Sequence, residues 1–195
     1  MSFQTGLSGL NASSKSLDVI GNNIANANTV GMKSSRAEFA DLVASSLGAG
    51  GGGAGAGIGV AVATIAQQFS QGNINITGNS LDVAINGNGF FQVTRPDGST
   101  AFTRDGQLKL DKDGNIITNT GAAVMGYPTD LITGAPTGVT PQPLSVPTSA
   151  PIPANATSIT ISAEGAVAVT VPGNTQPQTV GNLAMASFIN PAGLE

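Results

Sequence analysis

The chain has 195 residues, of which 40% are hydrophobic, 9% charged and 4% aromatic, and its formal net charge is −4. Cysteine, histidine and tryptophan are absent, which excludes disulfides, zinc-thiolate sites and Ser-His catalysis. The seven lysine and arginine residues are scattered and form no patch that would neutralise phosphates, so we expect no nucleic acid partner.

An apolar stripe with heptad spacing opens the chain. Positions 3, 7, 10, 14, 17, 21 and 24 follow one another in steps of four and three, the spacing of a coiled-coil seam. The large side chains of this stripe, with Ile20 beside it, are Phe3, Leu7, Leu10, Leu17, Ile20 and Ile24. Ser14 and Gly21 are small seam positions that let neighbouring backbones approach closely.

Three glycines weaken this helix. Gly6, Gly9 and Gly21 each cost a helix interior about 1 kcal/mol relative to alanine, and so short a segment does not offset that alone. We therefore expect residues up to about Asn28 to be frayed or loosely packed in the isolated chain, and to become a stable helix against other helices, from the same chain or from neighbouring subunits. The alternative is a helix packed on its own domain.

The run LDVIGNNIANANTVGMK at residues 17–33 is unusually rich in asparagine. It resembles the N-terminal signature of the bacterial flagellar rod and hook proteins, most closely that of the hook proteins. The residues that carry the resemblance are Asp18, Asn22, Asn23, Asn26, Gly31 and Lys33. Met32 departs from the family, which more often has phenylalanine there, and exchanging one flexible apolar side chain for another is conservative.

Between residues 34 and 59 the pattern weakens. Spaced apolar residues from Ala37 to Leu47 predict a short helix or an extended arm, so that residues 1–47 form one assembly segment. Residues 48–59, GAGGGGAGAGIG, predict a flexible linker. They do not predict a phosphate-binding loop, because no Gly-Lys-Ser/Thr follows them.

Residues 60–126 carry short alternating runs separated by Gly, Asn and Asp turns, which predicts antiparallel hairpins in a β-rich body. The runs are VAVATIAQQF, NINIT, LDVAI, GFFQVTR, TAFTR, QLKLD and NIITN. The expected core residues are Leu81, Val83, Ile85, Phe90, Val93, Phe102, Leu108, Leu110 and Ile116, with Phe91 on a second surface.

Two groups in this region imitate functional sites. Asp111, Asp113 and Asn115 open like a calcium loop, but Ile116 takes the place of the required glycine, so a hairpin turn is the better interpretation. Arg104 beside Asp105, and Arg95 near Asp97, are better explained as turn residues and surface ion pairs than as catalytic groups. We therefore predict no catalytic residue, no cofactor and no metal site.

Residues 72–121 resemble the family's next shared segment, in the expected order. Residues 127–153 are rich in proline and threonine, which predicts an extended linker. Residues 154–195 predict further strands, TSITIS, AVAVTV and LAMASFI, with a turn at Glu164-Gly165. This last part is closer to the distal rod members of the family. It stops without the C-terminal helix that the family pairs with the N-terminal one, so we expect a fragment, a truncated product or an atypical gene.

The residues thus predict a mainly β fold with an N-terminal α-helix. The resemblance implies a structural subunit of the flagellar hook, polymerising into a curved tube that acts as a universal joint and transmits torque. It implies a helical homo-oligomer as the main partner, with neighbouring rod, hook-cap and hook-filament junction proteins and the export apparatus, and no small-molecule substrate. Two alternatives stay open: a distal rod protein, and a β-rich surface adhesin or glycan-binding module.

The resemblance also implies a location in the basal body and hook, outside the cell. No stretch of the sequence approaches the roughly 18 to 20 apolar residues that span a bilayer. The N-terminus has neither a basic leader nor an uninterrupted apolar core. We therefore expect export through the flagellum's own type III channel without a cleaved signal peptide.

Overall fold

The computed structural model describes residues 2–43, 57–130, 138–145, 158–170 and 176–193. The chain forms two compact units. Unit 1 comprises Met1–Ser70 together with Asn190–Glu195, and unit 2 comprises Gln71–Ile189. The N-terminal helix belongs to unit 1, and the larger β-rich body is unit 2.

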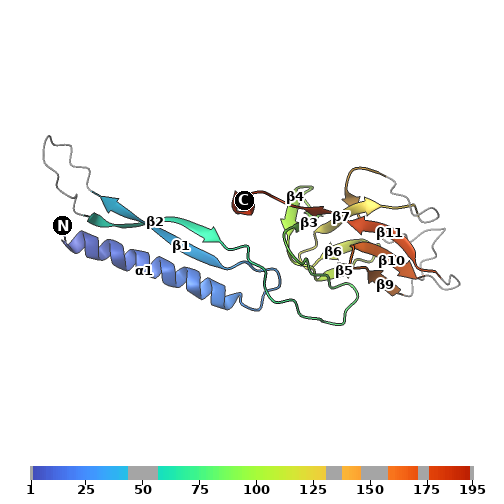
Figure 1. Ribbon diagram of the computed structural model, residues 1–195, viewed down its shortest axis with the longest axis horizontal. Helices are drawn as coiled ribbons and strands as arrows, with labels where there is room; N and C mark the ends of the chain where they lie inside the picture. Colours follow the sequence, from blue (N-terminus) through green and yellow to red (C-terminus); the bar gives the residue numbers. More distant parts are fainter. Residues whose placement is uncertain (1, 44–56, 131–137, 146–157, 171–175, 194–195) are drawn as a thin grey trace. The chain divides into compact units, whose positions relative to one another are not determined.

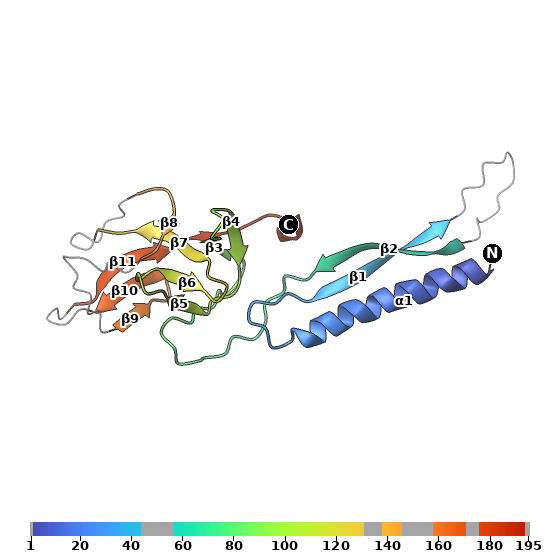
Figure 2. The same ribbon diagram turned by 180° about the vertical axis from the view of Figure 1, so that it is seen from behind.

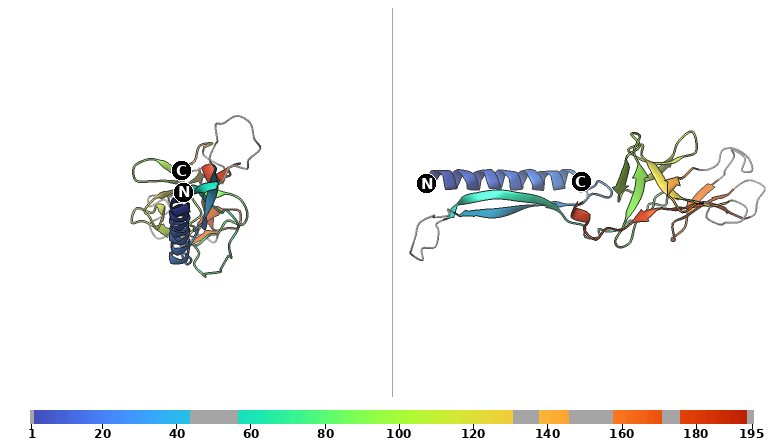
Figure 3. Two further views of the ribbon diagram at one scale, coloured as in Figure 1. Left: turned by 90° about the vertical axis from the view of Figure 1, so that its left-hand side faces the viewer. Right: turned by 90° about the horizontal axis from the view of Figure 1, so that it is seen from above.

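Unit 1 is a helix laid along a β-hairpin. Helix α1 spans Ser2–Ala25, and it contacts both strands of an antiparallel hairpin formed by β1 (Ser35–Val43) and β2 (Gly57–Gln67). Figure 3 shows the helix running along the length of the hairpin. A short 3-10 helix, η1 (Pro191–Gly193), also belongs to this unit.

Unit 2 is built from antiparallel strands (Figure 1). Its strands are β3 (Phe90–Thr94), β4 (Thr100–Thr103), β5 (Leu108–Leu110), β6 (Ile116–Thr118), β7 (Ala123–Pro128), β8 (Gln142–Pro143), β9 (Ser158–Ile161), β10 (Ala166–Thr170), β11 (Gln178–Leu183) and β12 (Met185–Ala186). The main path runs β12-β3-β7-β11-β10-β9, while β4 pairs with β3, β6 pairs with β5 and β7, and β8 pairs with β7. Strand β8 lies beside β7 (Figure 2).

Tight turns with glycine in the left-handed region connect the hairpins. The turn between β5 and β6 is closed by a 2.9 Å hydrogen bond from Gly114 N to Asp111 O, and Gly114 has φ +79°. The turn between β9 and β10 has the same form at Gly165, as the Glu164-Gly165 pair predicted. Both positions need glycine because other residues pay a steric penalty at positive φ.

The core of unit 2 joins the hairpins to the last strands. Its buried cluster is Val93, Leu108, Ile116, Ala122, Val124, Leu144 and Val167. Leu144 fits between β7 and β11 because Gly126 and Gly181 leave room for it: a Cβ at either glycine would collide with its side chain. This leucine comes from the proline-rich stretch that was expected to be a linker, and only 1% of it is exposed.

The predicted fold class is confirmed, and so are most of the core predictions. Ile85, Phe90, Val93, Leu108 and Ile116 are buried, and Leu81 and Val83 pack against the core. Phe91 is buried as well. Phe102 is half-buried. The prediction for Leu110 is wrong, since this last residue of β5 is 40% exposed although its partner in the register, Ile116, is buried.

Some predicted strands have other roles in the structure. Residues 60–67 pair with β1 inside unit 1, rather than opening the β-rich body, and residues 57–59 of the expected linker belong to the same strand. Residues 73–77, NINIT, form no strand, and residues 81–85 contribute one isolated bridge, Asp82 with Gln107. Alternation of side chains predicted the strand at residues 60–67 but could not identify its partner strand. The same pattern predicted a strand at residues 73–77, and this prediction is wrong.

The two predicted linkers lie partly outside the described residues. Of the stretch 127–153, Tyr127 and Pro128 belong to β7 and Gln142–Pro143 form β8, while residues 131–137 and 146–153 are outside the description. Of the stretch 48–59, residues 48–56 are outside it too. The arm predicted after Gly31 is extended, as strand β1.

Candidate assembly surface

The apolar stripe of α1 faces solvent along its whole length. Its large side chains are Phe3, Leu7, Leu10, Leu17, Ile20 and Ile24, and their exposed fractions are 82%, 48%, 71%, 67%, 49% and 70%. Large apolar side chains scattered singly on a surface are ordinary, but a continuous apolar stripe marks an interaction site. The structure therefore brings the predicted assembly residues onto one face and leaves that face uncovered within the described chain.

The opposite face of α1 packs on the hairpin with small side chains. The least exposed helix positions include Ser8, Ala12, Ser16, Val19 and Asn23, with Ala12 only 8% exposed. They are spaced by four, four, three and four residues, which places them on one side of a helix with 3.6 residues per turn. At that period they lie roughly opposite the stripe, so the helix buries its small face and exposes its large one.

Hydrogen bonds fix the helix to β2 at its N-terminal end. Thr5 Oγ1 donates to Ile58 O at 3.3 Å, and Val60 N donates to Ser8 Oγ at 3.3 Å. Gly59 lies between these contacts with φ +143°, and a Cβ there would stand 2.5 Å from Ser8 Oγ. Only glycine suits that position, because any side chain would push the strand away from the helix.

Asn23 fixes the other end of the helix to β1. Its Nδ2 donates to Ser35 O at 2.7 Å, and its Oδ1 accepts from Ser35 N at 2.9 Å. The side-chain amide therefore pairs with both backbone groups of one residue, as a neighbouring strand would. Both bonds are partly buried, where a lost partner costs more than it does in water.

The other signature residues shape the turn that follows the helix. Asn26 Nδ2 donates to Asn22 O at 3.1 Å, and Thr29 Oγ1 donates to Asn26 Oδ1 at 3.2 Å. Gly31 has φ +76°, and Lys33 Nζ donates to Ser70 O at 3.0 Å at the open end of the hairpin, where β1 begins and β2 ends. Asp18 forms an exposed ion pair with Lys15 at 3.6 Å. Apart from Asp18, the signature directs the chain from α1 into β1.

The hairpin has an apolar outer face of its own. In the register Phe39 is opposite Val62, and Ala37 is opposite Ile65. Gly59, the partner of Leu42 in the register, contacts the helix. Side chains alternate along a strand, so Phe39, three residues before Leu42, points to the side away from the helix. Phe39, Val62 and Ile65 are 44%, 36% and 52% exposed. Sequence reasoning missed this face, because residues 60–67 were assigned to the body.

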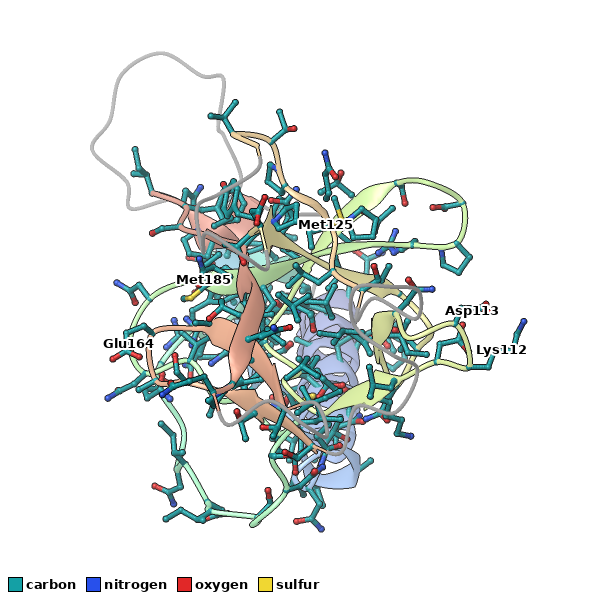
Figure 4. The ribbon with its side chains drawn as sticks, turned by 90° about the vertical axis from the view of Figure 1, so that its right-hand side faces the viewer. Lys112, Asp113, Met125, Glu164 and Met185 are labelled. Atoms are coloured by element: carbon teal, nitrogen blue, oxygen red, sulfur yellow. The ribbon has the colours of Figure 1, made fainter. Side chains whose placement is uncertain are left out.

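The acidic residues of unit 2 that were considered as possible functional groups take part in backbone turns. Lys112 and Asp113 project together from the β5–β6 turn, 3.4 Å apart (Figure 4). Hydrogen bonds from the Ser99 hydroxyl and amide hold the pKa of Asp97 below its ordinary value, with a smaller electrostatic contribution from Arg95. Asp105 Oδ1 accepts from Gln107 N at 3.0 Å. These carboxylates stabilise local backbone turns, which needs no pocket or substrate.

Arg104 packs inside unit 2. Its guanidinium lies 5.1 Å from the centre of the Phe90 ring, and its Nη1 donates to Gln71 Oε1 at 3.4 Å. Phe188 packs near the same ring and edge-on against Phe102. A cation over an aromatic face stabilises both groups, so Arg104 helps to join the start of unit 2 to its aromatic cluster.

Neither a metal cluster nor a membrane helix is found in the described ranges. Among these residues no group of three or more His, Cys, Asp or Glu side chains is arranged to hold a metal ion. No helix in the described part of the chain combines the length and the apolar character that crossing a membrane requires.

Comparison with known proteins gives consistent matches in two parts of the chain, the N-terminal segment and the middle. Residues 84–169 match the family described as flagellar hook protein FlgE/F/G D1 domain, and residues 3–33 match the family flagella basal body rod protein. The chain is similar to the flagellar basal-body rod protein FlgG of Buchnera aphidicola subsp. Schizaphis graminum, with 38% identity over 96% of this chain and 67% of that protein.

Two further relatives differ in the share of this chain that is similar to them. FlgG of Caulobacter vibrioides is 37% identical over 99% of this chain and 70% of its own length. The flagellar hook protein FlgE of Salmonella typhimurium is 42% identical, but over 75% of this chain and 35% of its own length. Similarity to these rod proteins extends over 96% and 99% of the chain, and similarity to the hook protein covers 75% of it.

Asn23→Asp is expected to weaken the attachment of β1 to α1, because a carboxylate cannot donate to Ser35 O. The loss should be about 1–3 kcal/mol, the usual cost of leaving a buried backbone group unsatisfied. Hydrogen exchange of the β1 amides in the full chain should become faster. Asn28→Ala, which changes an exposed asparagine of the following turn, is the control; equal effects of the two changes would contradict the role given to Asn23.

Proposed function

The chain belongs to the family of bacterial flagellar rod and hook proteins, and on this basis we propose that it is a self-assembling subunit of the flagellar axial structure. Many copies pack through α1 into a helical polymer, and the role is structural rather than catalytic. One observation carries the proposal: α1 contacts its own hairpin through small side chains and leaves its large apolar stripe exposed.

The hydrophobic effect supplies the driving force for assembly. Burial of apolar surface stabilises by about 25 cal/mol per Å², and the six exposed stripe residues gain this only when another molecule covers them. The helix thus becomes fully stabilised in the polymer, whereas in the single chain one side of it packs on its own hairpin and the stripe is exposed.

The glycines of α1 favour the same interpretation. A Cβ at Gly6, Gly9 or Gly21 would meet nothing within 4 Å, so no contact within the described chain requires these glycines. Each nevertheless costs the helix about 1 kcal/mol relative to alanine. Gly21 lies in the middle of the stripe, where the absence of a side chain lets a neighbouring helix come close.

The geometry of unit 1 suits an open polymer. The stripe on α1 and the outer hairpin face around Phe39, Val62 and Ile65 are different surfaces on opposite sides of a two-layer unit. Contacts between two different surfaces repeat from copy to copy, and they generate a filament when the rotation between copies does not close into a ring. We propose that both surfaces contact neighbouring copies.

Within the family, we propose a rod subunit as the better assignment, with the hook subunit as the second candidate. The rod relatives match 96% and 99% of the chain, including the end that resembles distal rod members. The hook candidate is favoured by the higher identity of 42%, which extends over 75% of the chain. Partners would be further copies, neighbouring rod, hook-cap and junction proteins, and the export apparatus.

Leu17→Asp or Ile24→Asp should abolish polymerisation while leaving unit 2 folded, because an unpaired charge would enter an apolar interface. The measurement is sedimentation of polymers, with circular dichroism to confirm the β-rich body. Asn22→Asp is the matched control for Ile24→Asp: it also places a carboxylate in the last turn of α1, but away from the stripe. Normal polymerisation and motility in both stripe variants would overturn the proposal.

Gly21→Ala should act in opposite directions on the single chain and on the polymer. The added methyl group should stabilise the helix by about 1 kcal/mol, and it should weaken assembly by filling space that a neighbour occupies. Helix content of the monomer and the critical concentration for assembly measure the two effects. Gly9→Ala, off the stripe, should stabilise without the second effect; if Gly21→Ala also leaves assembly unchanged, the close approach at Gly21 is refuted.

Immunogold labelling of isolated hook–basal bodies distinguishes the two candidates. Antibodies raised against unit 2 are expected to label the straight rod, because the rod relatives match 96% and 99% of the chain. Label confined to the curved hook would replace the rod assignment with the hook assignment, and it would leave self-assembly through α1 intact.

A further inference from the structure

The chain contains two Asn-Gly dipeptides, Asn86-Gly87 and Asn88-Gly89, side by side in the loop that leads into β3. Asn-Gly is the sequence in which a backbone amide most easily attacks the preceding side chain, because glycine presents no Cβ to obstruct the approach. The same loop therefore holds two potential sites of one reaction, and the fold surrounds them differently.

The first site is open. Asn86 and Gly87 are both exposed, and Gly87 has φ +100° with nothing within 4 Å of the place a Cβ would occupy. The structure shows no hydrogen bond to the Asn86 side chain or from the Gly87 N–H in the described part of the chain. Within the described residues, neither the attacking nitrogen nor the amide it would attack is held by a hydrogen bond.

The second site is closed. Gly89 is buried, and a Cβ built on it would lie 3.1 Å from Met185 Cε and 3.7 Å from Ala186 O. The next residue, Phe90, is paired with Ala186 across β3 and β12. Bringing Gly89 N onto the Asn88 side chain would rotate the peptide between them and disturb both the contacts of Gly89 and the pairing of Phe90 with Ala186.

We propose that Asn86 is a site of spontaneous deamidation in the folded protein and that Asn88 is protected. Gly87 N attacks Asn86 Cγ, a C–N bond forms, and the side-chain nitrogen leaves as ammonia with the proton lost from Gly87 N. The resulting succinimide adds one water molecule, which opens the ring at either carbonyl. The products are aspartate and isoaspartate at position 86, and no oxidant or cofactor takes part.

The modification changes the surface and leaves the core in place. Asn86 is flanked by Ile85, which is 8% exposed, and the loop ends at Phe90, which is 7% exposed. Ile85 O also accepts from Gln71 Nε2 at 3.3 Å. These anchors hold the two ends of the loop, so the exposed turn gains a negative charge and, in isoaspartate, one extra backbone carbon.

The test incubates the full chain in water enriched in oxygen-18 at neutral pH, and digests it for peptide mapping by mass spectrometry. Incorporated oxygen-18 marks product formed during the incubation, and fragment ions separate position 86 from position 88. We expect about tenfold or more product at Asn86 than at Asn88, a difference of roughly 1.4 kcal/mol in activation free energy. In urea both sites should react at similar rates, because the packing of Gly89 is then lost.

Two variants complete the test. Asn86→Gln keeps an amide but would have to close a larger, less favourable ring, so labelling at position 86 should disappear. Asn88→Gln should leave labelling at Asn86 unchanged. Equal labelling of the two sites in the folded chain, or no labelling at Asn86 while the urea sample reacts, would overturn the proposal.

Discussion

The structure of unit 1 depends on which face of α1 is buried against its own hairpin. Helix α1 presents small side chains such as Ser8, Ala12 and Ser16 to its hairpin, and close packing of small groups lets hydrogen bonds form between helix and strand. Phe3, Leu10 and Ile24 are left in water. A helix in a self-contained domain buries its large apolar face, so this inversion is what makes the unit incomplete as a single copy.

The attachment between helix and hairpin is correspondingly polar and specific. Thr5 and Ser8 bind one end of β2, and Asn23 binds the start of β1 through two hydrogen bonds. Hydrogen bonds specify position more sharply than apolar contact does, because their strength falls steeply with distance and angle. The hairpin therefore sets the direction in which the stripe points, and the stripe remains available for other molecules.

Unit 2 differs from unit 1 in how it buries its apolar side chains. It buries a continuous core in which Leu144, from a proline-rich stretch, fills the space left by Gly126 and Gly181. Carboxylates of this unit accept hydrogen bonds within turns, as Asp97 does from the Ser99 hydroxyl. Unit 2 therefore buries its own apolar side chains, whereas unit 1 leaves the stripe of α1 exposed.

The sequence by itself determined the heptad stripe, the hairpin turns and most core positions, because each depends on a local period or on a glycine that a turn requires. It also determined the family, through the asparagine-rich run. It could not show that residues 57–67 pair with β1, that Leu144 enters the core, or that the hairpin carries a second apolar face. Those features depend on contacts between residues far apart in the chain. The bond that joins α1 to β2, from Thr5 to Ile58, likewise spans 53 residues. Only the tertiary structure decides which of several compatible surfaces meet.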